Sequence, residues 1–258
     1  MPWITAADSD IGAREEQQDR YLVVRNDEGT SQLLVVADGA GGHTMGAMAA
    51  QTATTHIREN ITGLWRSEDP LAFLKNLIIE CNQRVLALSD TDLACSTIVM
   101  VFMRSDELFW GHVGDSRFYL IRNGEVISQT RDHSVAELQQ RQGEQVIGAD
   151  SASDNELYMC LGGLTDVTPE LDSSAAREGD SLLLCSDGLW GQTDMLRTFS
   201  ELSNTGISQE GLAKLVAQSI SAAKVAKPDN GDNITLVASQ YLEKPTFLRR
   251  LLNMIFKK

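Results

Sequence analysis

Aspartates follow or precede apolar, strand-like runs at four separate places in this chain. The segments are LLVVADGAGGH (Leu33 to His43), WGHVGDSR (Trp110 to Arg117), LLLCSDGLWG (Leu182 to Gly191) and GDNITLVAS (Gly231 to Ser239). A strand that delivers a carboxylate at its end can supply a ligand to a shared metal site, and a neighbouring glycine lets the backbone turn sharply and leaves a carbonyl free to coordinate. Oxygen-only ligands indicate Mg²⁺ or Mn²⁺ and not zinc. The candidate ligands are Asp38, Asp115, Asp187 and Asp232.

Each segment alone has an ordinary explanation, because an Asp-Gly pair after a strand is most often a turn. Four such segments, with GAREEQQDR (Gly12 to Arg20) ahead of them, would be an unusual set of unrelated turns. The glycines after Asp38 do not form a dinucleotide loop, since Thr44 stands where the last glycine of G-x-G-x-x-G should be. The joint pattern therefore favours one metal site.

In this order the segments resemble the PPM family of metal-dependent Ser/Thr protein phosphatases (type 2C), in its compact bacterial form, from about Trp3 to Ser239. The family motifs are roughly R-x-x-N-Q/E-D, D-G-x-G-G-H, G-D-S-R, S-D-G-L and D-N-I-T. They are matched by Arg14-Glu15-Glu16-Gln17-Gln18-Asp19, Asp38-Gly39-Ala40-Gly41-Gly42-His43, Gly114-Asp115-Ser116-Arg117, Ser186-Asp187-Gly188-Leu189 and Asp232-Asn233-Ile234-Thr235. Five motifs in register make the resemblance specific.

The resemblance implies a two-metal hydrolase that removes phosphate from phosphoserine and phosphothreonine in proteins. Asp38 would bridge two Mg²⁺ or Mn²⁺ ions, with the Gly39 carbonyl on one ion and Asp187 and Asp232 on the other. Asp115 would serve a weaker third ion with Asp187. A water activated by two cations is a sufficient nucleophile, so no protein nucleophile is required.

Two further residues of the first motif receive roles. Arg14 is expected to clamp the phosphate, because a guanidinium offers paired N–H donors to two phosphate oxygens; the alternative is a surface arginine near Glu15 and Glu16. Asp19 is expected to orient metal-bound water from outside the ligand set.

Departures from the family pattern support a second hypothesis, a catalytically weak phosphoprotein-binding or scaffold module of the same fold. Gln17 replaces the usual Asn, and Ala40 stands where eukaryotic members carry the histidine proposed as general acid. His43 is an alternative acid, but is more consistent with a structural role. The other histidines, His56, His112 and His133, are expected to pack or form hydrogen bonds.

Composition bounds the remaining possibilities. The 258 residues contain no linker-like tract, and 42% are hydrophobic, which is enough for a substantial core. The formal net charge of −14 argues against nucleic acid as a partner. No apolar run is long enough to span a membrane, and the segment MPWITAADSD lacks the basic region followed by an apolar stretch that is typical of a signal peptide. We therefore expect a cytoplasmic monomer, with buried free thiols at Cys81, Cys95, Cys160 and Cys185.

Strands and helices alternate in a way that could bring the motifs together. Strand composition and turn signals predict strands at Tyr21–Arg25, Gln32–Ala37, Cys95–Met103, Glu107–Val113, Phe118–Arg122, Glu125–Gln129, Ser181–Cys185 and Asn233–Gln240. Helical periodicity predicts helices at Met45–Glu59, Pro70–Leu88, Val135–Arg141 and Gln209–Ala223. In the second, Asn82 lies off the apolar face. The order indicates an α+β fold of antiparallel sheets with helices outside, and the resemblance sharpens this to an α/β/β/α sandwich.

Two segments are candidates for target selection. Ser134–Leu161 replaces a variable flap of the family, and loops of this kind commonly select substrates. We assign residues 1–242 to a phosphatase domain and 243–258 to a basic amphipathic tail, which is either a helix docked on the core or a contact with a partner or a membrane surface. The expected partners are phosphorylated proteins, in particular a bacterial Ser/Thr kinase and its targets.

Overall fold

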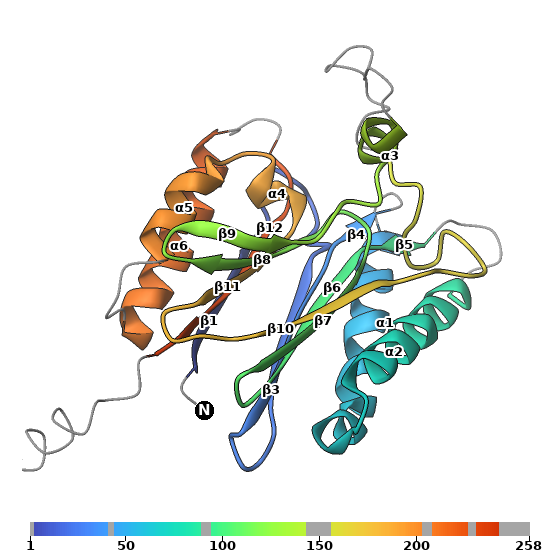
Figure 1. Ribbon diagram of the computed structural model, residues 1–258. Helices are drawn as coiled ribbons and strands as arrows, with labels where there is room; N and C mark the ends of the chain where they lie inside the picture. Colours follow the sequence, from blue (N-terminus) through green and yellow to red (C-terminus); the bar gives the residue numbers. More distant parts are fainter. Residues whose placement is uncertain are drawn as a thin grey trace, which may run out of the picture.

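The computed structural model describes residues 3–40, 44–88, 94–142, 156–202, 208–226 and 231–242. Their architecture is a sandwich of two five-stranded antiparallel sheets (Figure 1). The first sheet has the order β1 (Trp3–Asp10), β12 (Ile234–Tyr241), β11 (Ser181–Cys185), β8 (Arg117–Arg122), β9 (Glu125–Gln129). The second has the order β10 (Glu170–Ala175), β7 (Glu107–Val113), β6 (Ile98–Arg104), β3 (Ser31–Ala37), β2 (Arg20–Arg25). A short ribbon pairs β4 (Gly39–Ala40) with β5 (Cys95–Ser96).

Helices cover the outer face of each sheet (Figure 1). The second sheet carries α1 (Thr44–Asn60), the 3-10 helix η1 (Ile61–Arg66) and α2 (Pro70–Leu86), and the first carries α4 (Asp187–Trp190), α5 (Met195–Leu202) and α6 (Gln209–Ala226). The remaining helix, α3 (Val135–Gln142), projects beyond the sandwich. No helix in the described ranges is long and apolar enough to cross a membrane.

Three apolar clusters hold the layers together. One fills the space between the sheets with Val36, Val101, Phe118, Leu184 and Val237 among its members. The other two lie between each sheet and its helices. Strands whose two faces are both buried need apolar residues at successive positions, which explains continuous runs such as the one in β3. The predicted α/β/β/α sandwich is confirmed.

Most predicted elements lie within a few residues of their observed bounds. The Asn123-Gly124 turn joins β8 to β9 with positive φ at both residues, 54° and 80°, as the hairpin prediction requires.

The predicted strand Cys95–Met103 is in fact two strands, because Thr97 interrupts it. The elements β1, β4, β10, η1, α4 and α5 were not predicted. The polar composition of β10, an edge strand, explains why it gave no strand signal.

Asn82 is a correction to the predicted surface of α2. It is 1% exposed. Its Oδ1 accepts from Gly162 N at 2.7 Å, and its Nδ2 donates to the carbonyls of Leu164 and Thr165 at 3.0 and 3.1 Å. A buried amide side chain can satisfy the backbone groups of a loop that has no secondary structure of its own. Asn82 therefore fixes residues 162–165 on the helix.

The cysteine prediction is partly wrong. Cys81 and Cys185 are buried free thiols, as expected. Cys95 and Cys160 instead form a disulfide with an S–S length of 2.06 Å and a Cα–Cα distance of 6.0 Å. The two cysteines are 65 positions apart, so only the fold brings them into bonding range.

Removing the guanidinium of Arg122 should destabilise the first sheet. Asp180 is fully buried and accepts from Arg122 Nε and Nη2 at 2.6 and 2.8 Å. Arg122→Ala removes two donors from this carboxylate and keeps the backbone N–H of Arg177, so we expect a loss of about 2 kcal/mol in the free energy of unfolding by urea denaturation. Arg197→Ala is the matched control, because its pair with Glu201 lies on the surface and should contribute less than about 0.5 kcal/mol. Equal losses in the two variants would contradict the prediction.

Candidate metal centre

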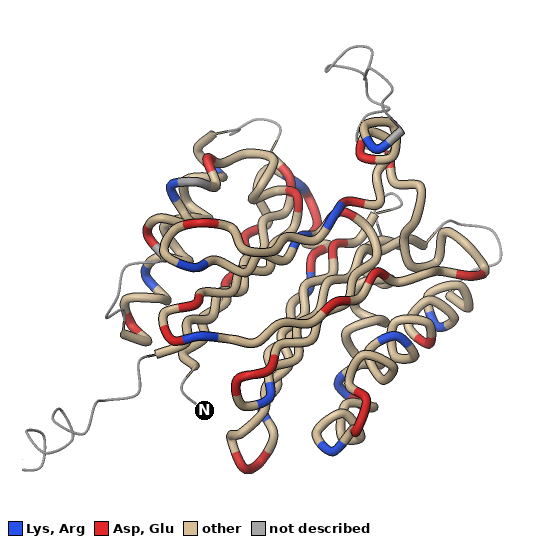
Figure 2. The backbone as a smooth tube through the Cα atoms, viewed as in Figure 1, with Lys and Arg blue, Asp and Glu red and all other residues tan. Residues whose placement is uncertain are grey.

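Five aspartates from separate segments share one site. Asp38, Asp115 and Asp187 follow β3, β7 and β11, while Asp19 and Asp232 precede β2 and β12. The pKa of Asp38 lies well above its ordinary value because of burial, followed by the charges of Asp19, Asp187, Asp115 and Asp232. The other acidic residues in the described part of the chain are spread over helices, strands and turns (Figure 2). The structure therefore brings together all five predicted carboxylates.

The carboxylates of the site raise one another's pKa values, because they are buried and lie close together. Burial, with neighbouring carboxylates, raises the pKa of Asp19 to about 6, of Asp187 to about 6 and of Asp115 to about 8. Two buried oxygens, Oδ1 of Asp19 and Oδ1 of Asp187, have no hydrogen-bond partner among the described residues. Buried carboxylate oxygens without donors are costly unless a cation meets them. This donor set fits a hard divalent cation.

Close backbone contacts explain the glycines beside the acidic residues. A Cβ on Gly39 would lie 2.2 Å from the carbonyl oxygen of Gly46 at the start of α1. A Cβ on Gly188 would lie 2.0 Å from the carbonyl oxygen of Asn233. The second contact joins the segment of Asp187 to that of Asp232, so a side chain at Gly188 would push two candidate ligands apart.

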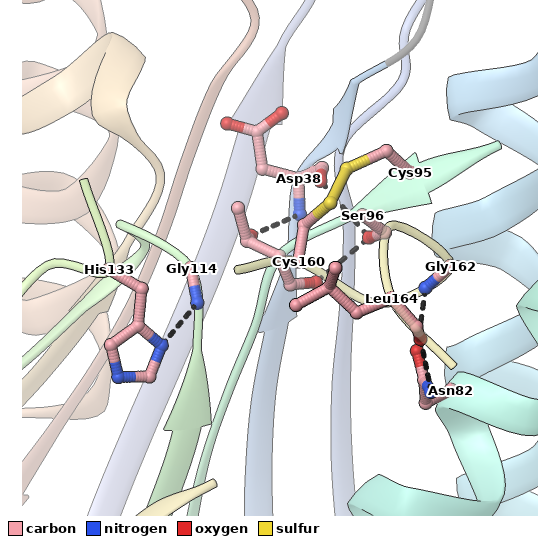
Figure 3. The surroundings of a disulfide bond; sticks show 10 residues. Asp38, Asn82, Cys95, Ser96, Gly114, His133, Cys160, Gly162 and Leu164 are labelled. Atoms are coloured by element: carbon pink, nitrogen blue, oxygen red, sulfur yellow. Dashed lines mark hydrogen bonds between the residues drawn. A yellow bond between two sulfur atoms is a disulfide. The ribbon is translucent and has the colours of Figure 1, made fainter. Parts of the chain in front are cut away.

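The backbone of Asp38 is held by β5 and the residue after it. Thr97 N and Ser96 Oγ donate to the Asp38 carbonyl at 2.8 and 3.0 Å, and Asp38 N donates to Thr97 Oγ1 at 3.0 Å. Figure 3 shows the Asp38 carboxylate pointing away from these bonds. Thr97 also shares a 2.7 Å hydrogen bond with Ser116, next to Asp115. Ser96 and Thr97 were not predicted, and nothing in their sequence context marks them as support for the site.

Asp19 lies where a supporting carboxylate was expected. It is 2% exposed, and its Oδ2 accepts from Ser186 Oγ at 2.7 Å. Ser186 in turn accepts from Thr235 N at 3.0 Å. The serine of the S-D-G-L motif thus connects Asp19 to the neighbours of Asp187 and Asp232, a role that the sequence analysis missed.

Arg14 is at the site, paired with a predicted metal ligand. Its Nε and Nη2 donate to Asp232 Oδ1 and Oδ2 at 3.0 and 2.7 Å. The Arg14 side chain is 60% exposed. The pKa of Arg14 is raised by this hydrogen bond and then by the charge of Asp232, with smaller contributions from Asp187 and Asp38. The guanidinium is therefore at the rim of the carboxylate cluster, accessible to an anion.

The loop that carries Arg14 is fixed by Asn233. Its Nδ2 donates to the carbonyls of Ile11 and Glu16 at 2.8 and 3.0 Å, and its Oδ1 accepts from Gln18 N at 2.7 Å. Gln17, which departs from the family pattern, accepts from Asp19 N at 3.0 Å and donates to Ser9 Oγ at 2.8 Å. This departure therefore leaves an ordered loop.

Asp115 is fixed by an aromatic neighbour. Trp190 Nε1 donates to the Asp115 carbonyl at 3.1 Å. The guanidinium of Arg117 lies 3.5 Å from the centroid of the Trp190 ring and donates to both oxygens of Asp132 at 2.9 and 2.7 Å. A cation over an indole face is a favourable arrangement. Trp190, the last residue of α4, thus connects the Asp115 segment to that of Asp187.

A second group of metal-ligand residue types consists of His112, His133 and Glu170. Gly114 N donates to His133 Nδ1 at 3.1 Å, so the neutral ring carries its proton on Nε2 and cannot coordinate through that atom. Burial lowers the pKa of both histidines, that of His133 to about 4. The two rings stack at 4.7 Å. The packing and hydrogen-bonding roles predicted for these histidines are confirmed, and His56 likewise contacts Glu80 at 3.0 Å. His43 lies outside the described residues.

The raised carboxyl pKa values predict how stability depends on pH in metal-free protein. Above about pH 4 the unfolded chain has released the carboxyl protons, whereas the native state keeps them up to about pH 6 on Asp19 and Asp187 and up to about pH 8 on Asp115. The unfolding free energy must therefore fall as pH rises through this window. We expect a lower Tm at pH 8 than at pH 5.5 in EDTA, and a larger increase in Tm on adding Mn²⁺ at pH 8. A metal-free Tm that rises over this interval would contradict the assignment.

Comparisons with known proteins agree with this geometry. The family model described as "Protein phosphatase 2C" matches residues 8–222. A Listeria monocytogenes serine/threonine phosphatase stp is 29% identical over 216 residues, covering 76% of this chain and 84% of that protein. The Mycobacterium tuberculosis serine/threonine protein phosphatase PstP is 32% identical over 186 residues, and the match spans 67% of this chain but 35% of PstP.

Solved structures share the fold along nearly the whole chain. The catalytic domain of PstP in complex with two manganese ions has a TM-score of 0.76 at 27% identity, covering 93% of this chain and 99% of that one. A Streptococcus agalactiae serine/threonine phosphatase has a TM-score of 0.78 at 26% identity, covering 93% and 100%. PppA, a key regulatory component of T6SS in Pseudomonas aeruginosa, has a TM-score of 0.76 at 25% identity, covering 92% of this chain and 97% of that one.

Proposed function

Because this chain belongs to the protein phosphatase 2C family of metal-dependent protein serine/threonine phosphatases, we propose that it hydrolyses phosphoserine and phosphothreonine in proteins. The observation that carries the proposal is the convergence of five aspartates, two of them with buried oxygens that lack a donor. The charges of such a cluster repel one another unless cations neutralise them, and divalent cations are effective catalysts of phosphate ester hydrolysis.

The ligand set we propose keeps the assignments made from the sequence. Asp38 with the Gly39 carbonyl would hold one Mg²⁺ or Mn²⁺ ion and share a second with Asp187 and Asp232. Asp115 would contribute to a weaker third ion with Asp187. When bound, these cations supply positive charge against the phosphate oxygens and a nucleophile from water at neutral pH. Asp19 would support them from the outside, since its Oδ2 already accepts from Ser186 and its Oδ1 has no hydrogen-bond partner in the part of the chain that the structure describes.

The protein's own residues bind and orient the phosphate. Arg14 lies at the exposed rim with its guanidinium beside Asp232. When a phosphate binds, the two N–H groups of Arg14 that now donate to the Asp232 carboxylate would donate to two phosphate oxygens instead. This pair of hydrogen bonds would orient the phosphate for in-line attack by water. Asp232 would turn from Arg14 toward the cation at the same time. The general acid for the leaving oxygen is not a side chain at position 40, where the residue is Ala.

The test of this function uses two substrates and one chelator. We expect turnover of p-nitrophenyl phosphate and of a phosphothreonine peptide with Mn²⁺, abolished by EDTA and restored by excess Mn²⁺. A metal-saturated protein with no turnover of either substrate would overturn the proposal. It would instead favour the phosphoprotein-binding module, for which Gln17 and Ala40 were the only indications.

We further propose a cytoplasmic monomer that opposes a Ser/Thr kinase and acts on the proteins which that kinase phosphorylates. The likeness to PppA makes a secretion-associated assembly one setting for such a pair. A catalytic cleft recognises little beyond a phosphate and its leaving group. Target selection is therefore assigned to the flap, 134–161, and to the tail, 243–258. Residues 143–155 and the whole tail lie outside the described residues.

Deleting Thr246–Lys258 should leave hydrolysis of p-nitrophenyl phosphate unchanged while weakening association with a phosphoprotein target or with anionic vesicles. The tail carries Arg249, Arg250, Lys257 and Lys258 on an otherwise acidic protein, so the association should also weaken with salt. Co-sedimentation with vesicles and pull-down of the phosphorylated target measure the effect. A truncated protein that melts much lower would show that the tail belongs to the core, and the docked-helix alternative would hold.

A further inference from the structure

The disulfide connects the metal-binding side of the molecule to the end of the flap. Cys95 belongs to β5, and Cys160 precedes Leu161, the last flap residue (Figure 3). Their sulfurs are joined across 65 positions of sequence. The bond therefore cross-links two segments that lie far apart in the sequence.

On one side of the disulfide, Cys95 lies in the strand that contacts the backbone of Asp38 and Gly39. The β4–β5 register pairs Ala40 with Cys95 and Gly39 with Ser96. Ser96 Oγ donates to the Asp38 carbonyl at 3.0 Å. A displacement of Cys95 is transmitted to the loop that presents two proposed metal ligands.

On the other side, Cys160 begins a segment fixed to the second sheet's helix layer. Leu161 exchanges backbone hydrogen bonds with Ser96 at 3.1 and 2.8 Å, and Gly162 N donates to Asn82 Oδ1 at 2.7 Å. Gly163 packs so closely that a Cβ there would lie 2.7 Å from Cys160 Sγ. Asn82 on α2 thus holds the segment that follows Cys160, and the disulfide links this segment to β5.

We propose that Cys95 and Cys160 form a redox latch of the metal centre: the disulfide holds the β4–β5 ribbon in its metal-binding arrangement, and reduction weakens divalent cation binding. The inference rests on the metal centre of the proposed function. Preorganised ligands bind more tightly because less conformational freedom is lost on binding. Removing the link restores motion to β5, and through Ser96 to the Asp38 backbone.

The redox step is thiol–disulfide exchange with a dithiol reductant. A thiolate of the reductant attacks one sulfur and forms a mixed disulfide, which releases the other cysteine as a thiolate that takes up a proton. The second reductant thiol then displaces the remaining cysteine. Two electrons and two protons pass to the protein, which gains two thiols, and the reductant becomes a disulfide. Cys95 and Cys160 are 6% and 7% exposed, so the reaction requires local opening and should be slow.

A stabilising cross-link without control of the metal predicts a different result. Loss of the disulfide would then lower Tm, because the unfolded chain regains conformational freedom. It would leave Mn²⁺ affinity in the folded state unchanged. Metal affinity is therefore the measurement that separates a latch from a cross-link.

The experiment compares oxidised and reduced full-length protein. Purification without reductant should give two reactive thiols after denaturation, those of Cys81 and Cys185, and dithiothreitol should add the two of the disulfide. After anaerobic removal of dithiothreitol, Mn²⁺ titration calorimetry should show binding weaker by about five- to tenfold in the reduced protein. Cys95→Ser and Cys160→Ser should match the reduced protein and not respond to dithiothreitol. Cys81→Ser, a buried free thiol on α2, is the matched control and should keep the response.

Two outcomes would overturn the latch alone: four reactive thiols in protein isolated under oxidising conditions, or equal Mn²⁺ affinity in both redox states. Protein that binds no Mn²⁺ in either state would overturn the proposed metal centre and the latch with it. The comparison of oxidised with reduced wild-type protein needs no substitution. It therefore tests the latch even if a serine variant fails to fold.

Discussion

Asp38→Ala should remove nearly all phosphatase activity and Mn²⁺ binding. Asp38 interacts with each of the other four aspartates of the centre, and it is the residue assigned to both ions. Without it the proposed ligand set would hold neither cation against the phosphate. We expect kcat/KM to fall by at least about a thousandfold, equivalent to about 4 kcal/mol. Turnover of p-nitrophenyl phosphate and Mn²⁺ titration calorimetry measure the two losses in the same preparation.

The variant should also be more stable than wild type in EDTA at pH 8, because it removes a buried carboxylate from a cluster whose members repel one another. This separates loss of the site from loss of the fold. Asp106→Ala, an exposed aspartate in the turn between β6 and β7, is the matched control and should retain activity. Equal Mn²⁺ affinity in wild type and Asp38→Ala would rule out Asp38 as a ligand. Asp187→Ala and Asp232→Ala should also lose activity.

Arg14→Ala should reduce phosphate engagement while metal binding is retained. The Arg14 guanidinium lies at the rim and contacts Asp232 through two hydrogen bonds, so it is close enough to reach a phosphate held by the same centre. Removing a donor that stabilises transition-state charge costs about 2–4 kcal/mol in kcat/KM, or about thirty- to a thousandfold. Steady-state kinetics with a phosphothreonine peptide, beside Mn²⁺ titration, test both halves of the expectation.

Arg14→Lys is the informative companion variant. It keeps the positive charge beside Asp232 but loses the paired donors, so its activity should lie between those of wild type and Arg14→Ala. Inhibition by inorganic phosphate should weaken in the same order. Loss of Mn²⁺ binding in Arg14→Ala would show that the arginine supports the metal ligands instead of the substrate. Unchanged kcat/KM in Arg14→Ala would show that Arg14 is a surface residue that pairs with Asp232 and does not bind the phosphate.

The candidate ligands could be identified from the sequence because their chemistry is local. A carboxylate at the end of an apolar run, with glycine beside it, is visible in a few consecutive residues, as at Asp38 and Asp187. Periodicity gave α1 and α2 for the same reason, since burial of one helix face repeats along the chain. The Asn123-Gly124 hairpin is equally local. Even so, the assignment of each aspartate to an ion remains a prediction.

The tertiary structure alone decided the contacts between residues far apart in sequence. No periodic signal indicates that Asn82 on a helix would be buried under residues 162–165, or that Cys95 would meet Cys160. The pairing of Arg14 with Asp232 spans 218 positions. These contacts depend on which strands lie side by side, and strand order is set by packing of the whole core. Residue type and local spacing thus determined what chemistry this protein could do, whereas the packing of its two sheets determined which groups meet to do it.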